Sequence, residues 1–112
     1  MSPITTHILD THRGCPAPGV PIELRILEAG SFQPLASGST NSDGRFPNLL
    51  SEGSLRKGVY QMRFDTGAYH EAIGIKGFYP EVVVTFEIVG LDQHYHIPLL
   101  LSPFGYSTYR GS

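Results

Sequence analysis

The chain has 112 residues, the length of one domain, and no linker or low-complexity tract divides it, so residues 1–112 are predicted to form a single domain. The net charge is −2 and there is no basic block, which argues against a nucleic-acid-binding surface. The longest apolar runs have three residues, against the ~20 that a membrane helix needs. Because the first residues lack the features of a secretory signal, we expect a cytoplasmic protein. Cys15 is the only cysteine, which excludes an intrachain disulfide bond.

Turn signals recur about every ten residues, a spacing typical of antiparallel β-sandwiches. The clearest alternation lies in 20–28, where every second residue from Val20 to Ile26 is apolar and the residues between include charged ones. In chain order, strands are predicted at residues 4–11, 20–28, 32–39, 59–64, 81–89, 94–101 and 106–109, with turns at 14–19, 41–44 and 102–105.

One short helix is expected, over residues 65–72, with Asp65 or Thr66 as the N-cap. The pattern as a whole predicts an all-β fold: a two-sheet sandwich of about eight strands, seven of which have the ranges given above, with this single short helix. Such a sandwich leaves edge strands exposed, and pairing between subunits is a common way to cover them.

Three features of the sequence carry candidate chemistry. Strand alternation puts His7 on the face opposite Ile4 and Ile8, so His7 points away from the core if these isoleucines point into it. The same argument puts His94 and His96 off the core face of their strand, and Pro98 there leaves one side of the strand unpaired or bulged.

Arg45 directly follows the Asn-Ser-Asp-Gly turn and offers a planar, permanently charged fork of hydrogen-bond donors. His7 can also be interpreted as an outward-facing strand residue without a function, and Arg45 as a solvated turn residue. The His-x-His spacing of His94 and His96 resembles a metal-binding pair, but no cysteine or clustered carboxylate beside it supplies further ligands. His94 lies nearer solvent than His96, and its contribution to a site stays open. His12 and His70 are interpreted as solvated, and Cys15 as a small turn residue rather than a catalytic thiol.

Longer motifs resolve this ambiguity. They are His-Ile-Leu-Asp at 7–10, Gly-Cys-Pro-Ala at 14–17, Thr-Asn-Ser-Asp-Gly-Arg at 40–45, Phe-Tyr-Pro-Glu at 78–81, the run from His94 to Pro103, and Gly105 to Ser112 ending in Tyr-Arg-Gly-Ser. With these motifs, almost the whole chain resembles the 5-hydroxyisourate hydrolases, the enzymatic relatives of the hormone carrier transthyretin. The terminal Tyr-Arg-Gly-Ser is typical of the hydrolase branch.

The resemblance implies a transthyretin-like sandwich that assembles into a homotetramer, a dimer of dimers, with active sites in the channel between facing sheets. It implies that His7, Arg45, His96 and Ser112 are catalytic, that Tyr109 helps to hold the substrate with His7 and Arg45, and that no metal or other cofactor takes part. The implied reaction is the hydrolysis of 5-hydroxyisourate in urate degradation.

The residue types suit this reaction. A neutral histidine is a competent base near pH 7, and an arginine can stabilise a developing oxyanion. Whether His7 or His96 is the base stays open at this point. Two other functions are considered: a transthyretin-like carrier, which a charged channel suits poorly, and a non-enzymatic adhesion or carbohydrate-binding sandwich.

Overall fold

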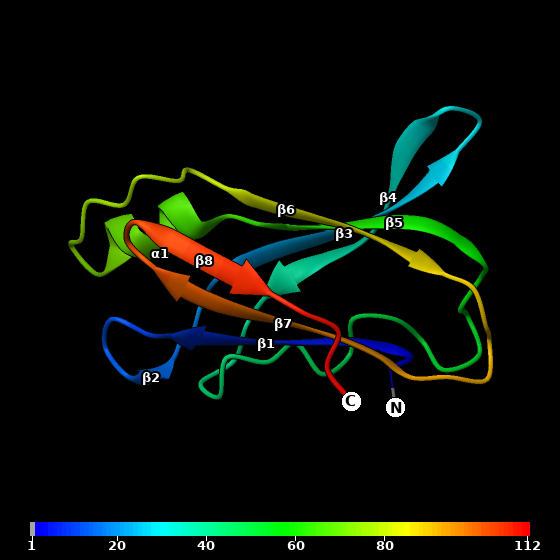
Figure 1. Cartoon of the computed structure of the whole chain (residues 1–112), viewed down its shortest axis with the longest axis horizontal. Helices are drawn as coiled ribbons and strands as arrows, with labels where there is room; N and C mark the ends of the chain where they lie inside the picture. Colours follow the sequence, from blue (N-terminus) through cyan, green and yellow to red (C-terminus); the bar gives the residue numbers. More distant parts are fainter. Residues whose placement is uncertain (1) are drawn as a thin grey trace.

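The computed structural model describes residues 2–112 and confirms the two-sheet sandwich (Figure 1). One sheet has the strand order β2-β1-β7-β8 and the other the order β4-β3-β5-β6. The strands are β1 (Ile4–Asp10), β2 (Cys15–Pro16), β3 (Pro21–Glu28), β4 (Ser31–Ser39), β5 (Gly58–Phe64), β6 (Val82–Ile88), β7 (Tyr95–Ser102) and β8 (Gly105–Thr108). Within residues 2–112 there is one helix, α1 (Thr66–Ala72), which links β5 to β6.

Each predicted strand is present to within two residues at either end, but β2 lies inside the segment that the sequence predicts as a Pro-rich turn. Its two residues pair antiparallel with Leu9 and Asp10 of β1. The amide of Gly14 donates to the carbonyl of Asp10 at 2.8 Å and closes the hairpin between the strands. The prolines in this segment make it look like a turn in the sequence. They are compatible with β2 because it is an edge strand, where a missing backbone amide is tolerated.

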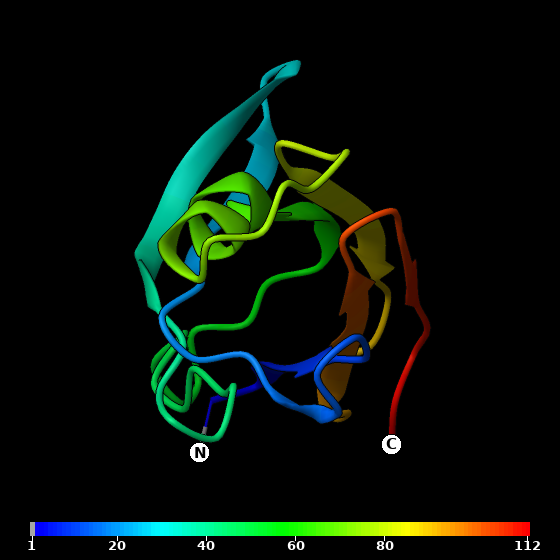
Figure 2. The same ribbon diagram turned by 90° about the vertical axis from the view of Figure 1, so that its left-hand side faces the viewer.

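The core lies between the sheets, and the end-on view shows them as two separate layers (Figure 2). In β1 the residues alternate between buried and half-buried, and Ile4 and Ile8 are fully buried. In β7, Leu99 and Leu101 are buried while His96 and Leu100 are only half-buried. The predicted inward and outward faces of both strands are therefore correct, because a period of two is the only way a strand can bury one face.

Helix α1 begins where the sequence predicts it, and Asp65 is the N-cap: its carboxylate accepts a hydrogen bond from the amide of Ala68 at 3.1 Å. The helix is joined to β1 by a buried hydrogen bond of 2.6 Å that Tyr69 donates to Asp10. Burial would raise the pKa of Asp10, but hydrogen bonds from Tyr69 and from the amides of Arg13 and His12 outweigh it and lower this pKa.

His70 contradicts the sequence interpretation. The sequence predicts a solvated side chain, but His70 is 3% exposed, and neither ring nitrogen has a hydrogen-bond partner among residues 2–112. Burial lowers the pKa of His70 and so favours the neutral form of the imidazole. His70 belongs to α1 and not to a loop, and it is on the face of the helix that packs inward.

Within the described residues no helix is long and apolar enough to cross a membrane.

Candidate active site

The central pair of strands in the first sheet, β1 and β7, runs parallel and sets the register of the site. Thr5 lies opposite His96, and His7 lies opposite Pro98. Because side chains alternate along each strand, Thr5, His7, His96 and Pro98 all project from the outer face of this sheet. Two histidines 89 positions apart in the sequence are thereby brought to one surface.

A tight turn brings Arg45 to this surface. The side-chain oxygen of Asn41 accepts hydrogen bonds from the amides of Asp43 and Arg45, at 2.9 and 3.1 Å. The carbonyl of Gly44 accepts from the amide of Ile8 at 2.9 Å, which fastens the turn to β1. As a result Arg45 forms an isolated antiparallel bridge with His7.

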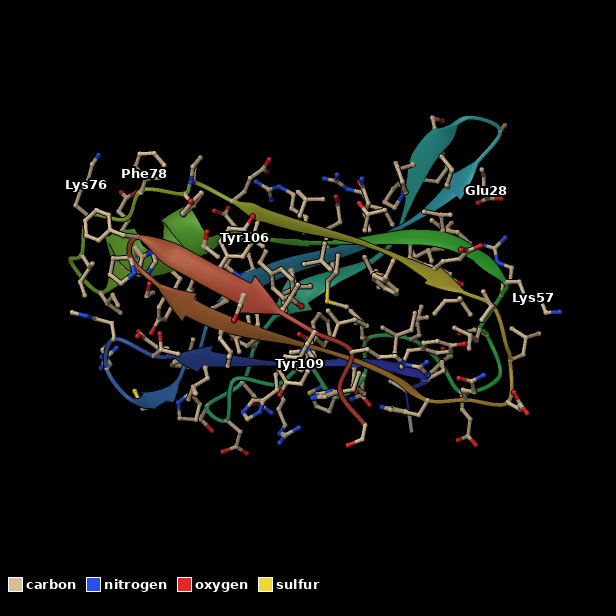
Figure 3. The ribbon with its side chains drawn as sticks, in the orientation of Figure 1. Glu28, Lys57, Lys76, Phe78, Tyr106 and Tyr109 are labelled. Atoms are coloured by element: carbon tan, nitrogen blue, oxygen red, sulfur yellow. The ribbon has the colours of Figure 1, made fainter. Side chains whose placement is uncertain are left out.

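The C-terminal segment covers the other side of His96. The amide of Gly111 donates to the carbonyl of His96 at 2.9 Å in a second isolated bridge. A Cβ atom on Gly111 would lie 2.6 Å from Cδ2 of the His96 ring, so only glycine lets the chain approach so closely. Figure 3 shows Tyr109 on the segment that follows β8, just before this contact.

Pro98 projects from the same face of β7 as His96, but unlike His96 it is buried. The same C-terminal segment covers it: a Cβ on Gly111 would lie 3.3 Å from its ring. On the β8 side the ladder ends at the Leu99–Thr108 pair, and the Thr108 hydroxyl donates to the Pro98 carbonyl at 2.7 Å. Pro98 has no backbone amide to donate, and the regular β7–β8 ladder stops just before it. One side of β7 is therefore unpaired at Pro98, as the sequence predicts.

The hydroxyl of Thr5 joins two imidazoles. Its Oγ1 lies 2.8 Å from Nε2 of His94 and 2.8 Å from Nδ1 of His96. His94 is exposed and His96 is half-buried. Nε2 of His96 has no hydrogen-bond partner within residues 2–112, and it is not among the buried polar atoms that lack a partner. This nitrogen is therefore open to a ligand.

The surroundings of His96 favour its neutral form. Burial lowers its pKa most, and the charges of Arg45, His94 and His7 lower it further. Both effects act in the same direction, because desolvation and neighbouring cations each penalise the imidazolium. A neutral imidazole with an open Nε2 is the state that can take a proton from water.

These residues surround a cleft with a volume of about 560 Å³, a size typical of small-ligand sites. Its lining includes Thr5, Arg45, His94, His96, Tyr109 and Ser112. His7 is the one predicted site residue that does not line the cleft. It lies beside the cleft, bridged to Arg45 and close enough to affect the pKa of His96.

The sequence reasoning missed Thr5 and left His94 open. Thr5 could have been found from its position, because it shares the outward face of its strand with His7 and precedes it by two residues. Among residues 2–112, no three His, Cys, Asp or Glu side chains gather closely enough to hold a metal ion. The His-x-His pair is instead joined through the Thr5 hydroxyl.

Known proteins share both the sequence and the fold. The model of the HIUase/Transthyretin family matches residues 4–111. A 5-hydroxyisourate hydrolase of Mus musculus is 48% identical over 113 residues, which cover 99% of this chain and 96% of the mouse protein. The structure of 5-hydroxyisourate hydrolase from Klebsiella pneumoniae superposes with a TM-score of 0.84 at 37% identity, over 97% of this chain and 98% of that one.

A crystal structure of sea bream transthyretin in complex with thyroxine superposes with a TM-score of 0.94 at 35% identity, over 98% of this chain and 95% of that chain. The sandwich is thus shared by enzyme and carrier, and the backbone alone does not separate them. With a matching family model over nearly its full length and relatives close to half identical, the chain belongs to the HIUase/Transthyretin family.

Proposed function

We propose that this protein hydrolyses 5-hydroxyisourate to 2-oxo-4-hydroxy-4-carboxy-5-ureidoimidazoline, a step of urate degradation. The observation that carries the proposal is the open Nε2 of His96 in a cleft that also presents Arg45 and Ser112. Full-length relatives named 5-hydroxyisourate hydrolase support the same activity. The carrier function is less well supported, because a charged arginine and imidazoles line this cleft and suit an apolar ligand poorly.

In the proposed reaction His96 is the general base. Its Nε2 takes a proton from a water molecule while the water oxygen attacks a carbonyl carbon of the six-membered ring. The guanidinium of Arg45 binds the carbonyl oxygen and stabilises the negative charge that develops there; one such donor typically contributes roughly 3 kcal/mol to the transition state. The ring C–N bond then breaks, the ring nitrogen takes up the proton held by Nε2 of His96, and the new carboxyl group loses its proton to solvent.

The other predicted residues have supporting roles in this proposal. Ser112 lines the cleft next to His96 and is expected to position the attacking water through its hydroxyl group. Tyr109, also in the lining, is expected to contact the flat substrate ring. His7 remains a second catalytic candidate beside Arg45, and it is expected to fix the position of the guanidinium. No step requires a metal or an organic cofactor.

The proposed functional unit is a homotetramer with active sites between facing sheets. The cleft opens on the outer face of the β2-β1-β7-β8 sheet, which is the face that a second sheet would cover. The free edge strands β6 and β8 lie on the same side of the sandwich and flank a mainly apolar groove lined by Val84, Phe86 and Thr108, among others. Edge-to-edge pairing there would form the dimer. A cytoplasmic location also stays a prediction.

The test is an ultraviolet assay in which urate oxidase generates 5-hydroxyisourate and its decay is followed with and without the protein. We expect wild type to accelerate the decay and His96→Asn to lose about 10²–10⁴-fold in kcat, the contribution of a positioned base. His12→Asn is the matched control, because His12 is an exposed histidine in the turn after β1. Equal turnover by wild type and His96→Asn would contradict the mechanism, and no acceleration by wild type would contradict the function.

A further inference from the structure

The Thr5 hydroxyl occupies a position that the hydrolysis described above leaves unexplained. Its oxygen lies 2.8 Å from Nδ1 of His96 and 2.8 Å from Nε2 of His94, so one hydroxyl group serves two rings. A hydroxyl carries one proton and two lone pairs, and a neutral imidazole carries one N–H group. The direction of the hydrogen bond between Thr5 and His96 therefore fixes the direction of the bond between Thr5 and His94.

Two arrangements make a hydrogen bond at both contacts. In the first, Nδ1–H of His96 donates to Thr5 and the Thr5 hydroxyl donates to Nε2 of His94. In the second, both directions are reversed, so that His94 donates to Thr5 and Thr5 donates to Nδ1 of His96. Only the first leaves Nε2 of His96 with a lone pair toward the cleft, since the second puts the single proton of a neutral His96 on Nε2.

We propose that Thr5 and His94 are positioning residues that hold His96 in the Nδ1–H tautomer and so make its Nε2 the base. The inference rests on the proposed function, because that function requires a free lone pair at Nε2. Thr5 touches His96 directly, whereas His94 acts through Thr5 by accepting the hydroxyl proton.

The fold fixes these groups in place. Thr5 lies opposite His96 in the parallel ladder between β1 and β7, so the backbone sets the distance between the hydroxyl and the ring. Gly111 packs against the Cδ2 edge of the same ring and limits its rotation. With its edge packed and Nδ1 engaged, His96 can present only Nε2 to a ligand in the cleft.

The tautomer survives turnover only if the proton that Nε2 of His96 takes from water leaves by the same atom. In the proposed reaction Nε2 gives this proton to the ring nitrogen as the C–N bond breaks, and the proton of the ionised carboxyl group goes to solvent. A transfer from Nδ1 through Thr5 to His94 would instead leave His96 in the Nε2–H tautomer. The contacts of Thr5 with His96 and His94 therefore hold the tautomer and do not carry the proton away.

The experiment compares Thr5→Val with Thr5→Ser. Valine keeps the β-branched shape but removes the hydroxyl, whereas serine keeps the hydroxyl. We expect Thr5→Val to lower kcat about 10- to 100-fold with little change in KM, since a histidine in the wrong tautomer can cost up to about 10⁴-fold. Thr5→Ser should retain most of the wild-type kcat. Thr85→Val is the control for loss of a threonine hydroxyl on an exposed strand position.

The decisive readout is the tautomer of His96, measured from the ¹⁵N chemical shifts of its ring nitrogens in the full-length protein. In wild type Nδ1 should be of the protonated type and Nε2 of the unprotonated type. His94→Phe removes the acceptor of the Thr5 proton, so Thr5 should turn to Nδ1 of His96 and shift the proton to Nε2. His94→Gln keeps an acceptor and should preserve more of the wild-type tautomer and rate.

The outcomes separate this inference from the proposed function. If wild type is active but Thr5→Val keeps both its kcat and the His96 tautomer, the inference is wrong and the function stands. Loss of kcat with an unchanged tautomer would also overturn it. If wild type does not hydrolyse 5-hydroxyisourate, the function fails, and the wild-type ¹⁵N shifts still decide whether Thr5 and His94 set the tautomer.

Discussion

At the scale of single residues, the proton affinity of His96 links the geometry of the cleft to a measurable pH dependence. Burial lowers its pKa from the ordinary value of 6.5, and the charges of Arg45, His94 and His7 lower it further. Protonation removes the lone pair of Nε2, so kcat/KM should fall only when the pH drops below the ordinary histidine range. A base with a lowered pKa stays active in mildly acidic solution.

Removing a neighbouring cation tests this account. Arg45→Gln takes away a charge that disfavours the imidazolium, so the pKa of His96 should rise and the acid limb of kcat/KM should move to higher pH. The midpoint is read from the pH profile, or from an NMR titration of His96 if turnover is too low. Arg25→Gln, which removes an arginine paired with Glu23 on the other sheet, should leave the midpoint unchanged. An unchanged or lower midpoint in Arg45→Gln would contradict the electrostatic argument.

Residues differ in how far the sequence predicts their surroundings. Alternation placed His7 and His96 on the outer face, because strand geometry has a fixed period of two. It could not show that Thr5 joins the two imidazoles of the His-x-His motif, since that contact depends on the register of strands about 90 positions apart. Nor could it show that His70 is buried, because its position depends on how α1 packs and not on any local pattern.

At the scale of elements, the turn at residues 41–45 decides where the guanidinium lies. Gly44 has a φ of +73°, and a Cβ atom there would lie 2.5 Å from the carbonyl oxygen of Ile8. The position therefore needs glycine for two reasons: a backbone conformation that other residues avoid, and the close approach of the turn to β1. Arg45 is the next residue, so the contact between Gly44 and Ile8 sets the position of its backbone.

Gly44→Ala should disturb both stability and activity. We expect a loss of about 2–4 kcal/mol in the free energy of unfolding, from backbone strain together with the steric clash against β1. Because the turn must move away from Ile8, kcat/KM should fall as well. Urea unfolding and the ultraviolet assay measure the two effects.

Gly30→Ala is the matched control for Gly44→Ala. Gly30 lies at the tip of the β3–β4 hairpin with a φ of +83°, and a Cβ atom added there would meet no other atom within 4 Å. The substitution should cost only about 1–2 kcal/mol, the strain of the left-handed conformation, and should leave kcat/KM unchanged. If the two variants lost equal stability and both kept full activity, the contact between the turn and β1 would not be what positions Arg45.

Elements with a clear alternation of apolar residues or a clear turn motif were predictable from the sequence. Elements that form only by pairing with a distant strand were not. The alternation over 20–28 and the Asn-Ser-Asp-Gly turn act locally, and both are present as predicted. Strand β2 has only two residues and exists because β1 offers it an edge, so no local pattern marks it. The bridge between Gly111 and His96 likewise forms only once β7 and the last residues meet.

At the scale of the whole molecule, the question is what covers the outer face of the β2-β1-β7-β8 sheet. The cleft opens there, and apolar side chains flank it: Leu9 and Leu100 lie opposite each other in the ladder and are only half-buried. In the proposed tetramer this face packs against the same face of another subunit, which would close the cleft from above. Exclusion of water from such a site strengthens each electrostatic contact within it.

A charge placed on this face should separate assembly from folding. Leu100→Asp puts a carboxylate where the proposed tetramer would bury it, at a desolvation cost of roughly several kcal/mol per charge. Leu35→Asp, on β4 in the other sheet, introduces the same charge at an exposed position. Light scattering after size-exclusion chromatography should give about four times the 12.3 kDa chain mass for wild type and Leu35→Asp, and a smaller assembly for Leu100→Asp. The smaller assembly should also lose activity while keeping its β-sheet circular dichroism, since its fold is complete but its cleft stays open. A wild-type monomer with full turnover would show instead that one chain provides the whole site.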